Sequence, residues 1–218
     1  MRAFLFDLNG TMIDDMSYHA RAWTKLANGD LGGNFSPADI KREMYGKNPE
    51  VMVRMFGKDR FSADEMRTLS MNKENYYQAE YLPDLKLIDG LEDFLAAAKK
   101  AGIPMAIGSA AIPYNIDFVL DNLNIRHYFE AVVSADDVEL SKPHPETFLK
   151  AAQKLQVSIA DCIVFEDVPK GVEAAANAGM VSVVITTTHT EEEFEGLTNI
   201  LHFAKDYTPD FFNQLIQS

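Results

Sequence analysis

The chain has 218 residues, of which 47% are hydrophobic and 24% are charged, the proportions of an ordinary globular protein. Its formal net charge of −13 argues against nucleic acid and against an anionic membrane surface as partners, because both would repel the chain. It does not argue against a phosphorylated substrate, since local fields and a metal ion decide that binding. The single cysteine, Cys162, excludes an internal disulfide framework and favours a reducing compartment.

The predicted elements begin with a buried strand at 3–8, which is interrupted by Asp7 and followed by Asn9 and Gly10. This apolar run is too short for the core of a signal peptide. Elsewhere, no apolar stretch approaches the ~20 residues that are needed to span a bilayer. We therefore expect a cytoplasmic protein without a membrane partner. The oligomeric state stays open, and a monomer is compatible with the sequence.

Residues 14–86 contain helical patterns and no convincing strand. The patterns lie at 16–27, 37–44, 49–56 and 63–82. Pro83 and Gly90 mark the return to a different organisation. These features predict an all-helical cap domain at 14–86, inserted directly after the first strand, and a core domain formed by 1–13 and 87–218.

From Leu91 onward, short apolar runs alternate with helical patterns. Strands are predicted at 104–108, 131–134, 162–165 and 181–185, and helices at 91–101, 113–123, 145–155 and 171–178. Gly102 and Gly179 stand where a left-handed C-cap is expected. Continuous apolar strands bounded by helices indicate a parallel sheet that is covered on both faces. The predicted fold is therefore α/β, with a doubly wound, Rossmann-like parallel sheet.

A polar motif, Asp7-Leu8-Asn9-Gly10-Thr11, directly follows the first strand. The Asp7 carboxylate is therefore expected near the carboxyl edge of the sheet, where doubly wound folds bind their ligands. Taken alone, the motif is equally compatible with a turn, because Asp and Asn favour loop geometry and Gly supplies positive φ.

Three further polar motifs follow later strands in chain order. Gly108-Ser109-Ala110 presents a hydroxyl, Ser141-Lys142-Pro143-His144-Pro145 presents a lysine between stiffening prolines, and Glu166-Asp167 presents two adjacent carboxylates. Each motif alone is more often structural than catalytic. Four of them at successive strand ends are much harder to explain as turns.

With these four motifs, the chain resembles the haloacid dehalogenase superfamily over nearly its whole length. Tyr18-His19-Ala20-Arg21-Ala22-Trp23 and the Glu166-Asp167 pair are similar to the branch that contains β-phosphoglucomutase and sugar phosphatases. The resemblance implies a Rossmann-like core with a helical cap. It also implies a phosphatase or phosphomutase that acts on small phosphorylated metabolites, with sugar phosphates as the expected substrates and Mg²⁺ as the cofactor.

The resemblance assigns the carboxylates to attack and to metal binding. Asp7 is the expected nucleophile, which would form an aspartyl phosphate. Asp7, Asp167 and the backbone carbonyl of Asn9 would bind Mg²⁺, an ion that prefers hard oxygen ligands. Glu166 would either ligate the ion directly or orient water bound to it.

The remaining motif residues are assigned to the phosphoryl group. Lys142 would hold the Asp7 carboxylate together with a phosphoryl oxygen. The Ser109 side chain and the Gly108-Ser109-Ala110 backbone would donate hydrogen bonds to the other phosphoryl oxygens.

One position departs from the family pattern. Phosphatases and mutases of the superfamily have a second aspartate two residues after the nucleophile, where it protonates the leaving oxygen; here that position is Asn9. A carboxamide donates a hydrogen bond, but it cannot shuttle a proton. Because general acid–base catalysis contributes roughly 10²–10⁴-fold, we expect slow turnover of an alkyl phosphate.

Four explanations for Asn9 stay open. A cap residue supplies the proton, with His19 as the first candidate and Asp14 and Asp15 behind it. The substrate has a good leaving group, such as an acyl phosphate or pyrophosphate. The asparagine is an engineered replacement that traps substrate. The protein has lost turnover and become a binding or regulatory module. A simpler interpretation of His19 is packing, because it lies four residues before Trp23 on one helix face.

The cap also departs from β-phosphoglucomutase, in which an arginine between the cap helices grips the distal phosphate. The comparable turn, Tyr45-Gly46-Lys47-Asn48-Pro49-Glu50, has Pro49 at the expected position of that arginine. Lys47 or Arg54 could bind substrate in its place, and both are equally compatible with solvated surface cations. The departure favours a phosphatase of a small sugar or polyol phosphate over a genuine mutase.

Two other chemistries of the superfamily fit less well. Dehalogenases need no metal, and Glu166-Asp167 beside Asp7 would form a costly anionic cluster without a cation. Phosphonate hydrolases use a cap lysine as a Schiff base, and nothing distinguishes Lys25, Lys41 or Lys47 for that role. The sequence therefore predicts a Mg²⁺-dependent hydrolase or mutase. The alternative is a catalytically silent module that binds Mg²⁺ and a phosphorylated ligand.

Overall fold

The computed structural model describes residues 2–217, and the chain divides into two compact units. One unit is the cap, Asp15–Leu85, and the other is the core, which contains the rest of the described chain. The sequence places the cap at 14–86, one residue from the structural division at either end. No helix among the described residues is both long enough and apolar enough to cross a membrane.

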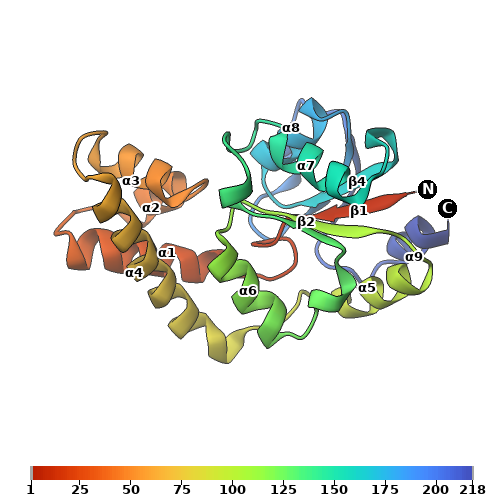
Figure 1. Cartoon of the computed structure of the whole chain (residues 1–218), viewed down its shortest axis with the longest axis horizontal. Coiled ribbons are helices and arrows are strands. Elements are labelled where there is room, and N and C mark those ends of the chain that lie inside the picture. Colours follow the sequence, from red (N-terminus) through yellow and green to blue (C-terminus); the bar gives the residue numbers. More distant parts are fainter. Residues whose placement is uncertain (1, 218) are drawn as a thin grey trace. The chain divides into compact units, whose positions relative to one another are not determined.

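The core contains a six-stranded parallel sheet (Figure 1). Its strands are β1 (Ala3–Phe6), β2 (Met105–Gly108), β3 (Ala131–Val133), β4 (Cys162–Glu166), β5 (Val181–Ile185) and β6 (Ile200–Ala204). Their order, β3-β2-β1-β4-β5-β6, is that of a doubly wound sheet with a switch point between β1 and β4. The predicted α/β class is therefore confirmed.

The edge strand β6 has no counterpart among the predicted strands. It contains an exposed leucine, Leu201, and a polar residue, His202. His202 interrupts the apolar run of β6, whereas the other edge strand, β3, is an unbroken apolar run that the sequence predicts at 131–134.

Helices cover both faces of the sheet (Figure 1). They are α5 (Leu91–Lys100), α6 (Pro113–Asn122), α7 (Glu146–Leu155), α8 (Pro169–Asn177) and α9 (Asp210–Gln217). On one face, Ala3 and Leu5 of β1 join a buried cluster with Phe148 of α7 and Ala174 of α8. The alternate residues of β1 point to the opposite face, as the two-residue period of a strand requires.

An aromatic cluster fills the opposite face of the sheet. Phe6 of β1 stacks on Phe165 of β4 with ring centroids 4.5 Å apart, and Phe4 stacks on Phe94 of α5 at 5.4 Å. Phe212 of α9 packs edge-on against Phe94 at 5.2 Å. Aromatic pairs of this kind contribute about 0.5–1.5 kcal/mol each beyond the area that they bury. They hold β1 and β4 together at the switch point of the sheet.

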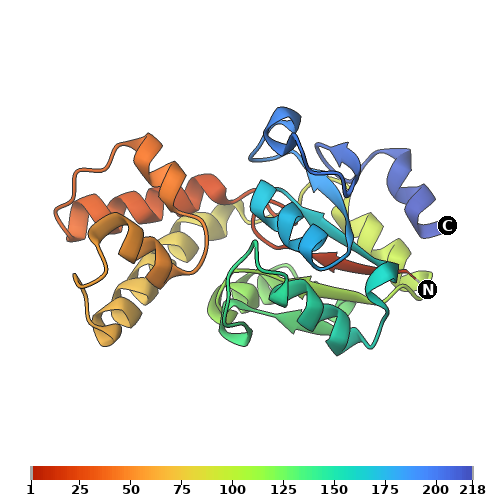
Figure 2. The same ribbon diagram turned by 90° about the horizontal axis from the view of Figure 1, so that it is seen from above.

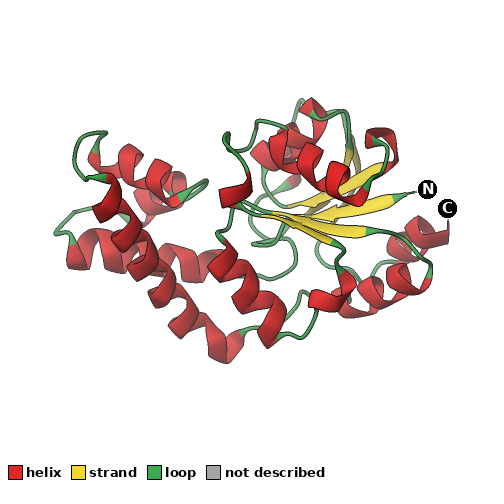
Figure 3. Ribbon diagram, viewed as in Figure 1, coloured by secondary structure: helices red, strands yellow, loops and turns green. Residues whose placement is uncertain are grey.

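The cap is built from helices alone within its residues 15–85 (Figure 3). Its helices are α1 (Met16–Thr24), which continues as a π-helix (Lys25–Asp30), α2 (Pro37–Glu43), α3 (Asn48–Phe56) and α4 (Ala63–Tyr81). They form a bundle of their own (Figure 2) around a core that includes Trp23, Ile40 and Met52. Ser62 begins α4 through a capping box with Glu65, which satisfies backbone donors at the helix start.

Candidate active site

The ends of neighbouring strands bring the predicted motifs together. Phe6 lies opposite Phe165 in the β1–β4 register, so the next residues, Asp7 and Glu166, leave the sheet side by side. The Asp7 N–H donates to the Phe165 carbonyl at 3.0 Å and extends this pairing. Gly108 ends β2, the other neighbour of β1. The switch point therefore collects residues from three of the four motifs.

Lys142 supplies the fourth motif. Its ammonium donates to Asp7 Oδ1 at 2.6 Å, to Glu166 Oε1 at 2.7 Å and to the Gly108 carbonyl at 3.1 Å. These bonds use all three hydrogens of the ammonium. Burial disfavours the charged form of Lys142, but the carboxylates of Asp7 and Glu166 outweigh it and raise its pKa above the ordinary value. The lysine is a fixed cation at this edge of the sheet.

Three buried carboxylates meet beside that lysine. Asp7, Glu166 and Asp167 are 7%, 0% and 1% exposed, and one oxygen of each lies within 4.8 Å of the other two. Burial raises the pKa of Asp7 to about 7, with Lys142 opposing the shift and Glu166 adding to it. Burial, followed by the charges of Glu166 and Asp7, raises the pKa of Asp167 well above its ordinary value. One ammonium does not balance three carboxylates.

This cluster fits a hard divalent cation. Mg²⁺ prefers carboxylate, carbonyl and water oxygens, and all three side chains offer oxygen. Among residues 2–217, these three form the one group of His, Cys, Asp or Glu that is arranged to hold a metal. Burial is the main cause of the two raised aspartate pKa values, and repulsion among the carboxylates adds to it. A bound cation would offset that repulsion.

Glu166 is held on both of its oxygens. Oε1 accepts from Lys142, and Oε2 accepts from the N–H groups of Asp167 at 2.9 Å and Val168 at 3.2 Å. The carboxylate also fills the space beside Gly171, where an added Cβ would lie 1.9 Å from Oε1. These contacts fix Glu166 at the start of α8, where helix N–H groups favour an anion.

Asp167 is held by two threonine hydroxyls. Thr11 donates to Oδ1 at 3.1 Å, and Thr188 donates to Oδ2 at 2.5 Å. Gly10 passes directly beside this carboxylate, and an added Cβ would lie 2.1 Å from Oδ2. The φ of Gly10 is +77°, so both its conformation and its lack of a side chain are required here.

Asn9 lies in the loop that turns back after β1. The Gly10 N–H donates to the Ile13 carbonyl at 2.8 Å, and Asn9 itself forms an isolated bridge with Ile13. Along the chain, this loop places Asn9 between Leu8 and Gly10, two residues after Asp7. Nothing in this geometry gives Asn9 a means of transferring a proton.

Ser109 is buried at the end of β2. Its N–H donates to the Val133 carbonyl at 2.9 Å, and its Oγ accepts from the Ala111 N–H at 3.1 Å. The backbone donor of Ser109 is therefore used within the sheet, which leaves the hydroxyl hydrogen as the donor of this residue. Gly108 contributes its carbonyl to Lys142, and Ala110 follows Ser109 at the same edge.

The cap contains a second buried polar cluster, around His19. The Nδ1 of His19 lies 2.5 Å from Lys73 Nζ, and its Nε2 lies 3.3 Å from Asp15 Oδ2. Tyr77 donates to the same Asp15 oxygen at 2.6 Å, and its ring stacks on His19 with centroids 3.9 Å apart. An ammonium can only donate, so Nδ1 accepts, and the proton of a neutral imidazole lies on Nε2 and faces Asp15. Both ring nitrogens therefore have partners inside the cap.

Lys73 also contacts a carboxylate. Its Nζ lies 3.1 Å from Glu74 Oε2, and Asn48 donates to Glu74 Oε1 at 2.6 Å. Burial lowers the pKa of Lys73, and the adjacent Glu74 carboxylate opposes that shift. A lysine, a histidine and two carboxylates are thus joined into one hydrogen-bonded network inside the cap.

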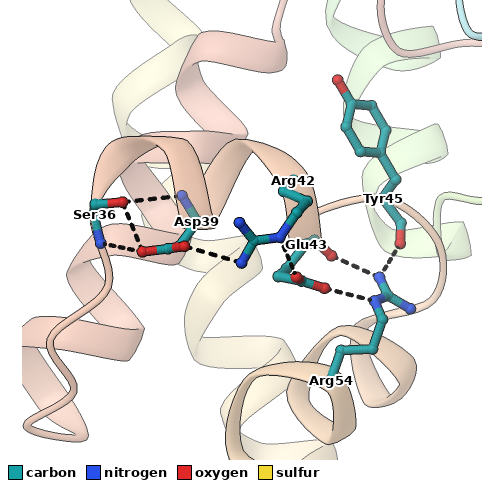
Figure 4. A network of polar contacts seen from close by, with 6 residues as sticks. All are labelled: Ser36, Asp39, Arg42, Glu43, Tyr45 and Arg54. Atoms are coloured by element: carbon teal, nitrogen blue, oxygen red, sulfur yellow. Dashed lines mark hydrogen bonds and ion pairs between the residues drawn. The ribbon is translucent and has the colours of Figure 1, made fainter.

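Arg54, a predicted substrate-binding residue, is engaged within the cap (Figure 4). Its guanidinium donates to the Glu43 carbonyl at 2.6 Å and to the Tyr45 carbonyl, and lies 3.3 Å from the Glu43 carboxylate. These carbonyls lie at the C-terminal end of α2, where a helix leaves acceptors without intrahelical donors. At the other end of α2, Ser36 and Asp39 form a capping box. Arg54 therefore has a structural role that accounts for it.

The predicted residues belong to both units of the chain. Asp7, Lys142, Glu166 and Asp167 contact one another in the core, and Gly108 joins them through its carbonyl. The predicted substrate residues of the cap are His19, Arg54 and Lys47, of which Lys47 is half-buried at the start of α3 and donates its N–H to Glu50. Their part in substrate binding stays a prediction.

Several residues of both clusters escape sequence-based prediction. In the core these are Thr188, which donates to Asp167, and Tyr207. The Tyr207 hydroxyl donates to the Thr11 carbonyl at 3.0 Å. A usable signal exists for Thr188, because the run Thr186-Thr187-Thr188-His189-Thr190 directly follows β5 at the active edge. In the cap, Lys73, Glu74 and Tyr77 resemble ordinary polar positions of a long helix and give no such signal.

Known proteins resemble the chain closely. The profile of the family described as haloacid dehalogenase-like hydrolase matches residues 1–179. The fructose-1-phosphate phosphatase of Escherichia coli is 29% identical over 82% of this chain and 93% of its own, and the β-phosphoglucomutase of Bacillus subtilis is 31% identical over 84% and 82%. The crystal structure of β-phosphoglucomutase from Clostridium difficile superposes with a TM-score of 0.85 at 27% identity, covering 99% of this chain and 96% of the other.

Proposed function

The chain belongs to the haloacid dehalogenase-like hydrolases and is an enzyme of that family; from this premise we propose that it is a Mg²⁺-dependent phosphatase of small sugar phosphates. A phosphomutase is the alternative within the same chemistry. Relatives named as a fructose-1-phosphate phosphatase and a β-phosphoglucomutase support a sugar phosphate as substrate. Pro49 stands where β-phosphoglucomutase is expected to have its phosphate-binding arginine, and this difference favours a phosphatase over a mutase.

One observation carries the proposal: three buried carboxylates share a single lysine at the switch point of the sheet. Asp7 and Asp167, with the Asn9 carbonyl, would hold Mg²⁺, and Glu166 would ligate it or orient water bound to it. When bound, the ion offsets the repulsion between the Asp7 carboxylate and a phosphate dianion. Mg²⁺ suits this cluster because its three side-chain ligands are buried carboxylate oxygens that outnumber the cations around them.

The reaction begins with Asp7. One of its oxygens attacks phosphorus, the bond from phosphorus to the leaving oxygen breaks, and an aspartyl phosphate forms. Lys142 fixes the attacking carboxylate through the 2.6 Å bond to Oδ1, and the Ser109 hydroxyl donates to a phosphoryl oxygen. Water then attacks the phosphorus of the intermediate and releases inorganic phosphate, which restores Asp7.

Asn9 sets the open chemical question of this mechanism. A proton must reach the leaving oxygen of a sugar phosphate, and the carboxamide cannot supply it. Two cap candidates, His19 and Asp15, are already bonded to each other and to Lys73 or Tyr77. This engagement counts against both as the proton donor. Asp14, the third candidate, is exposed and stays open, as does a substrate whose leaving group needs little protonation.

The test is phosphate release from a panel of sugar phosphates, acetyl phosphate and pyrophosphate, with Mg²⁺ and with chelator. We expect phosphate release that depends on Mg²⁺. Asp7→Asn should lower its rate by at least about 10⁴-fold, because the variant lacks the nucleophile. Asp93→Asn, an exposed carboxylate on α5, is the matched control and should retain activity. Full release by Asp7→Asn, or release that is indifferent to chelator, would refute the proposal.

Asn9→Asp then measures what the missing acid contributes. If no other residue moves the proton, turnover of sugar phosphates should rise by roughly 10²–10⁴-fold, while acetyl phosphate, a better leaving group, should gain much less. An equal gain on both substrates would mean that the substitution acts through the metal or the fold, and not through protonation.

A second candidate function rests on the same residue. Asn9 is compatible with a catalytically silent module that binds Mg²⁺ and a phosphorylated ligand. Such a module would show no turnover on any member of the panel, and a sugar phosphate would bind in calorimetry only when Mg²⁺ is present. Turnover that depends on Asp7 would exclude it.

A further inference from the structure

The loop after β5 reaches both catalytic loops of the core. β5 runs parallel to β4, with Val184 opposite Glu166, so its loop leaves the sheet at the same edge as Asp167. The Thr187 hydroxyl donates to the Gly10 carbonyl in the loop after β1. The next hydroxyl, of Thr188, donates to the Asp167 carboxylate in the loop after β4. Two adjacent threonines thereby tie the two carboxylate-bearing loops to a third.

We propose that Thr188 is a positioning residue, which holds Asp167 in the orientation that binds Mg²⁺. The inference deepens the proposed function and rests on it in one respect, since it takes Asp167 as a metal ligand. Thr188 lies 2.5 Å from Asp167 Oδ2 and 3.2 Å from the Asp167 carbonyl. The Thr188 hydroxyl therefore contacts both the side chain and the backbone carbonyl of Asp167.

The direction of the hydrogen bonds follows from the donor count. A threonine hydroxyl has one hydrogen, and the short contact to a carboxylate oxygen, which can only accept, uses it. His189 Nδ1 lies 2.9 Å from the same hydroxyl oxygen, so Nδ1 carries a hydrogen and donates it to Thr188. The chain of donors runs from His189 through Thr188 to Asp167, and each bond in such a chain strengthens the next.

The two hydroxyls also fix the plane of the Asp167 carboxylate. Thr11 binds Oδ1 at 3.1 Å while Thr188 binds Oδ2, so rotation of the carboxylate would break both bonds. A carboxylate has about four acceptor sites, and one hydroxyl on each oxygen leaves further lone pairs for a cation. Partners of this kind behind a metal ligand typically contribute 10–100-fold to metal affinity.

The experiment is Mg²⁺ binding to the whole, metal-stripped protein by titration calorimetry. Thr188→Val keeps the shape of the side chain and removes the hydroxyl, and we expect the Mg²⁺ dissociation constant to rise about 10–100-fold. Thr188→Ser keeps the hydroxyl and should stay within about threefold of the unchanged protein. Thr186→Val is the matched control on the same loop, because the Thr186 hydroxyl donates to the Ala204 carbonyl of β6 at 3.3 Å.

Several results would overturn the inference. Equal Mg²⁺ affinity of Thr188→Val and the unchanged protein would do so, as would an equal loss in Thr186→Val or a failure of Thr188→Ser to restore binding. Thr188→Ala replaces the valine variant should that one not fold, as judged by circular dichroism. Binding also separates this inference from the proposed function. If Mg²⁺ binding needs Thr188 but the protein shows no turnover, only the proposed phosphatase activity is refuted. If turnover depends on Mg²⁺ but Thr188→Val binds Mg²⁺ normally, only the role of Thr188 is refuted.

Discussion

The core and the cap each bury a cluster of charged residues, and the two clusters are balanced differently. In the core, the carboxylates of Asp7, Glu166 and Asp167 face a single ammonium. In the cap, Asp15 and Glu74 are bonded to Lys73, His19, Tyr77 and Asn48, so donors from several side chains surround two carboxylates. The cap cluster sets two carboxylates beside one ammonium and leaves one buried carboxylate oxygen, Oδ1 of Asp15, outside its hydrogen bonds. The core cluster sets three carboxylates beside one ammonium.

The comparison distinguishes a binding site from a structural network. A buried charge is tolerated when it is paired and hydrogen-bonded, and it costs several kcal/mol when it is not. The cap supplies partners for its carboxylates from within the chain, with Oδ1 of Asp15 as the exception. The core carboxylates are hydrogen-bonded as well, but three of their oxygens lie within 4.8 Å of one another beside one ammonium. A cation from outside is needed to balance their charge. Removing the lysine from either cluster should destabilise the protein, but only its removal from the core cluster should lower turnover.

The largest effect is expected for Lys142→Met. The substitution leaves Asp7 and Glu166 buried without their cation, so the free energy of unfolding should fall by about 3–5 kcal/mol. Turnover should fall by at least about 10²–10³-fold, because the attacking carboxylate loses its fixed partner. Urea unfolding and kcat/KM measure the two losses. Lys150→Met on the exposed side of α7 should change neither; full activity in Lys142→Met would break the comparison.

Lys73→Met is the corresponding change in the cap. It removes the cation from Glu74 and the donor from His19, and the free energy of unfolding should again fall by about 3–5 kcal/mol. The Mg²⁺ affinity of the folded protein should stay the same, since the carboxylates arranged to hold a metal among the described residues lie in the core. Arg67→Met, which breaks an exposed ion pair on the same helix, should have little effect on stability. An altered Mg²⁺ affinity in Lys73→Met would show that the clusters are not independent.

Mg²⁺ itself should stabilise the core. A ligand present at 100 times its dissociation constant stabilises the folded state by about 2.7 kcal/mol. In a chain of this size, that amounts to a rise in Tm of roughly 5–11 °C. Differential scanning calorimetry with and without MgCl₂ measures the shift, with NaCl of equal ionic strength as the control. Asp167→Asn should lose the shift, and a Tm that ignores Mg²⁺ in the unchanged protein would contradict a metal site at the switch point.

The smallest predicted effect compares two glycines of similar conformation. Gly10 and Gly102 have φ of +77° and +72°, but an added Cβ meets the Asp167 carboxylate only at Gly10, whereas nothing lies within 4 Å at Gly102. Alanine at either position costs about 1–2 kcal/mol of backbone strain. Only Gly10→Ala should also lower Mg²⁺ affinity, by about 10–100-fold. Equal Mg²⁺ affinity in the two variants would mean that Asp167 shifts aside without consequence.

Much of the core can be predicted from its sequence because the relevant signals are local. Inner strands are continuous apolar runs, and the polar residues that follow Phe6 and Phe165 must emerge at one edge of a parallel sheet. That Asp7 and Glu166 share this edge follows from the sequence, and the adjacency of β1 and β4 in the sheet then brings the two side by side. The edge strand β6 is the exception, because His202 interrupts its apolar run, whereas the other edge strand, β3, is an unbroken one.

The cap cluster could not be predicted in the same way. Lys73 and Glu74 are polar residues in a long helix, and polar residues in such a helix are usually solvated. Both are almost fully buried here, 2% and 3% exposed, because α1 packs against α4 and brings His19 to Lys73. Helical periodicity describes which residues share a face of one helix, but it does not say which second helix will cover that face.

The sequence by itself determined the α/β class, the helical cap and the four motifs that carry the carboxylates and the lysine, because each depends on the pattern along one element and on the position of strand ends. Tertiary structure decided the surroundings of those groups. Thr188 reaches Asp167 from 21 positions further along the chain, and Asp15, His19 and Lys73 join through packing between helices. Which distant residues become hydrogen-bond partners depends on how the elements pack, and a pattern along one element does not specify that packing.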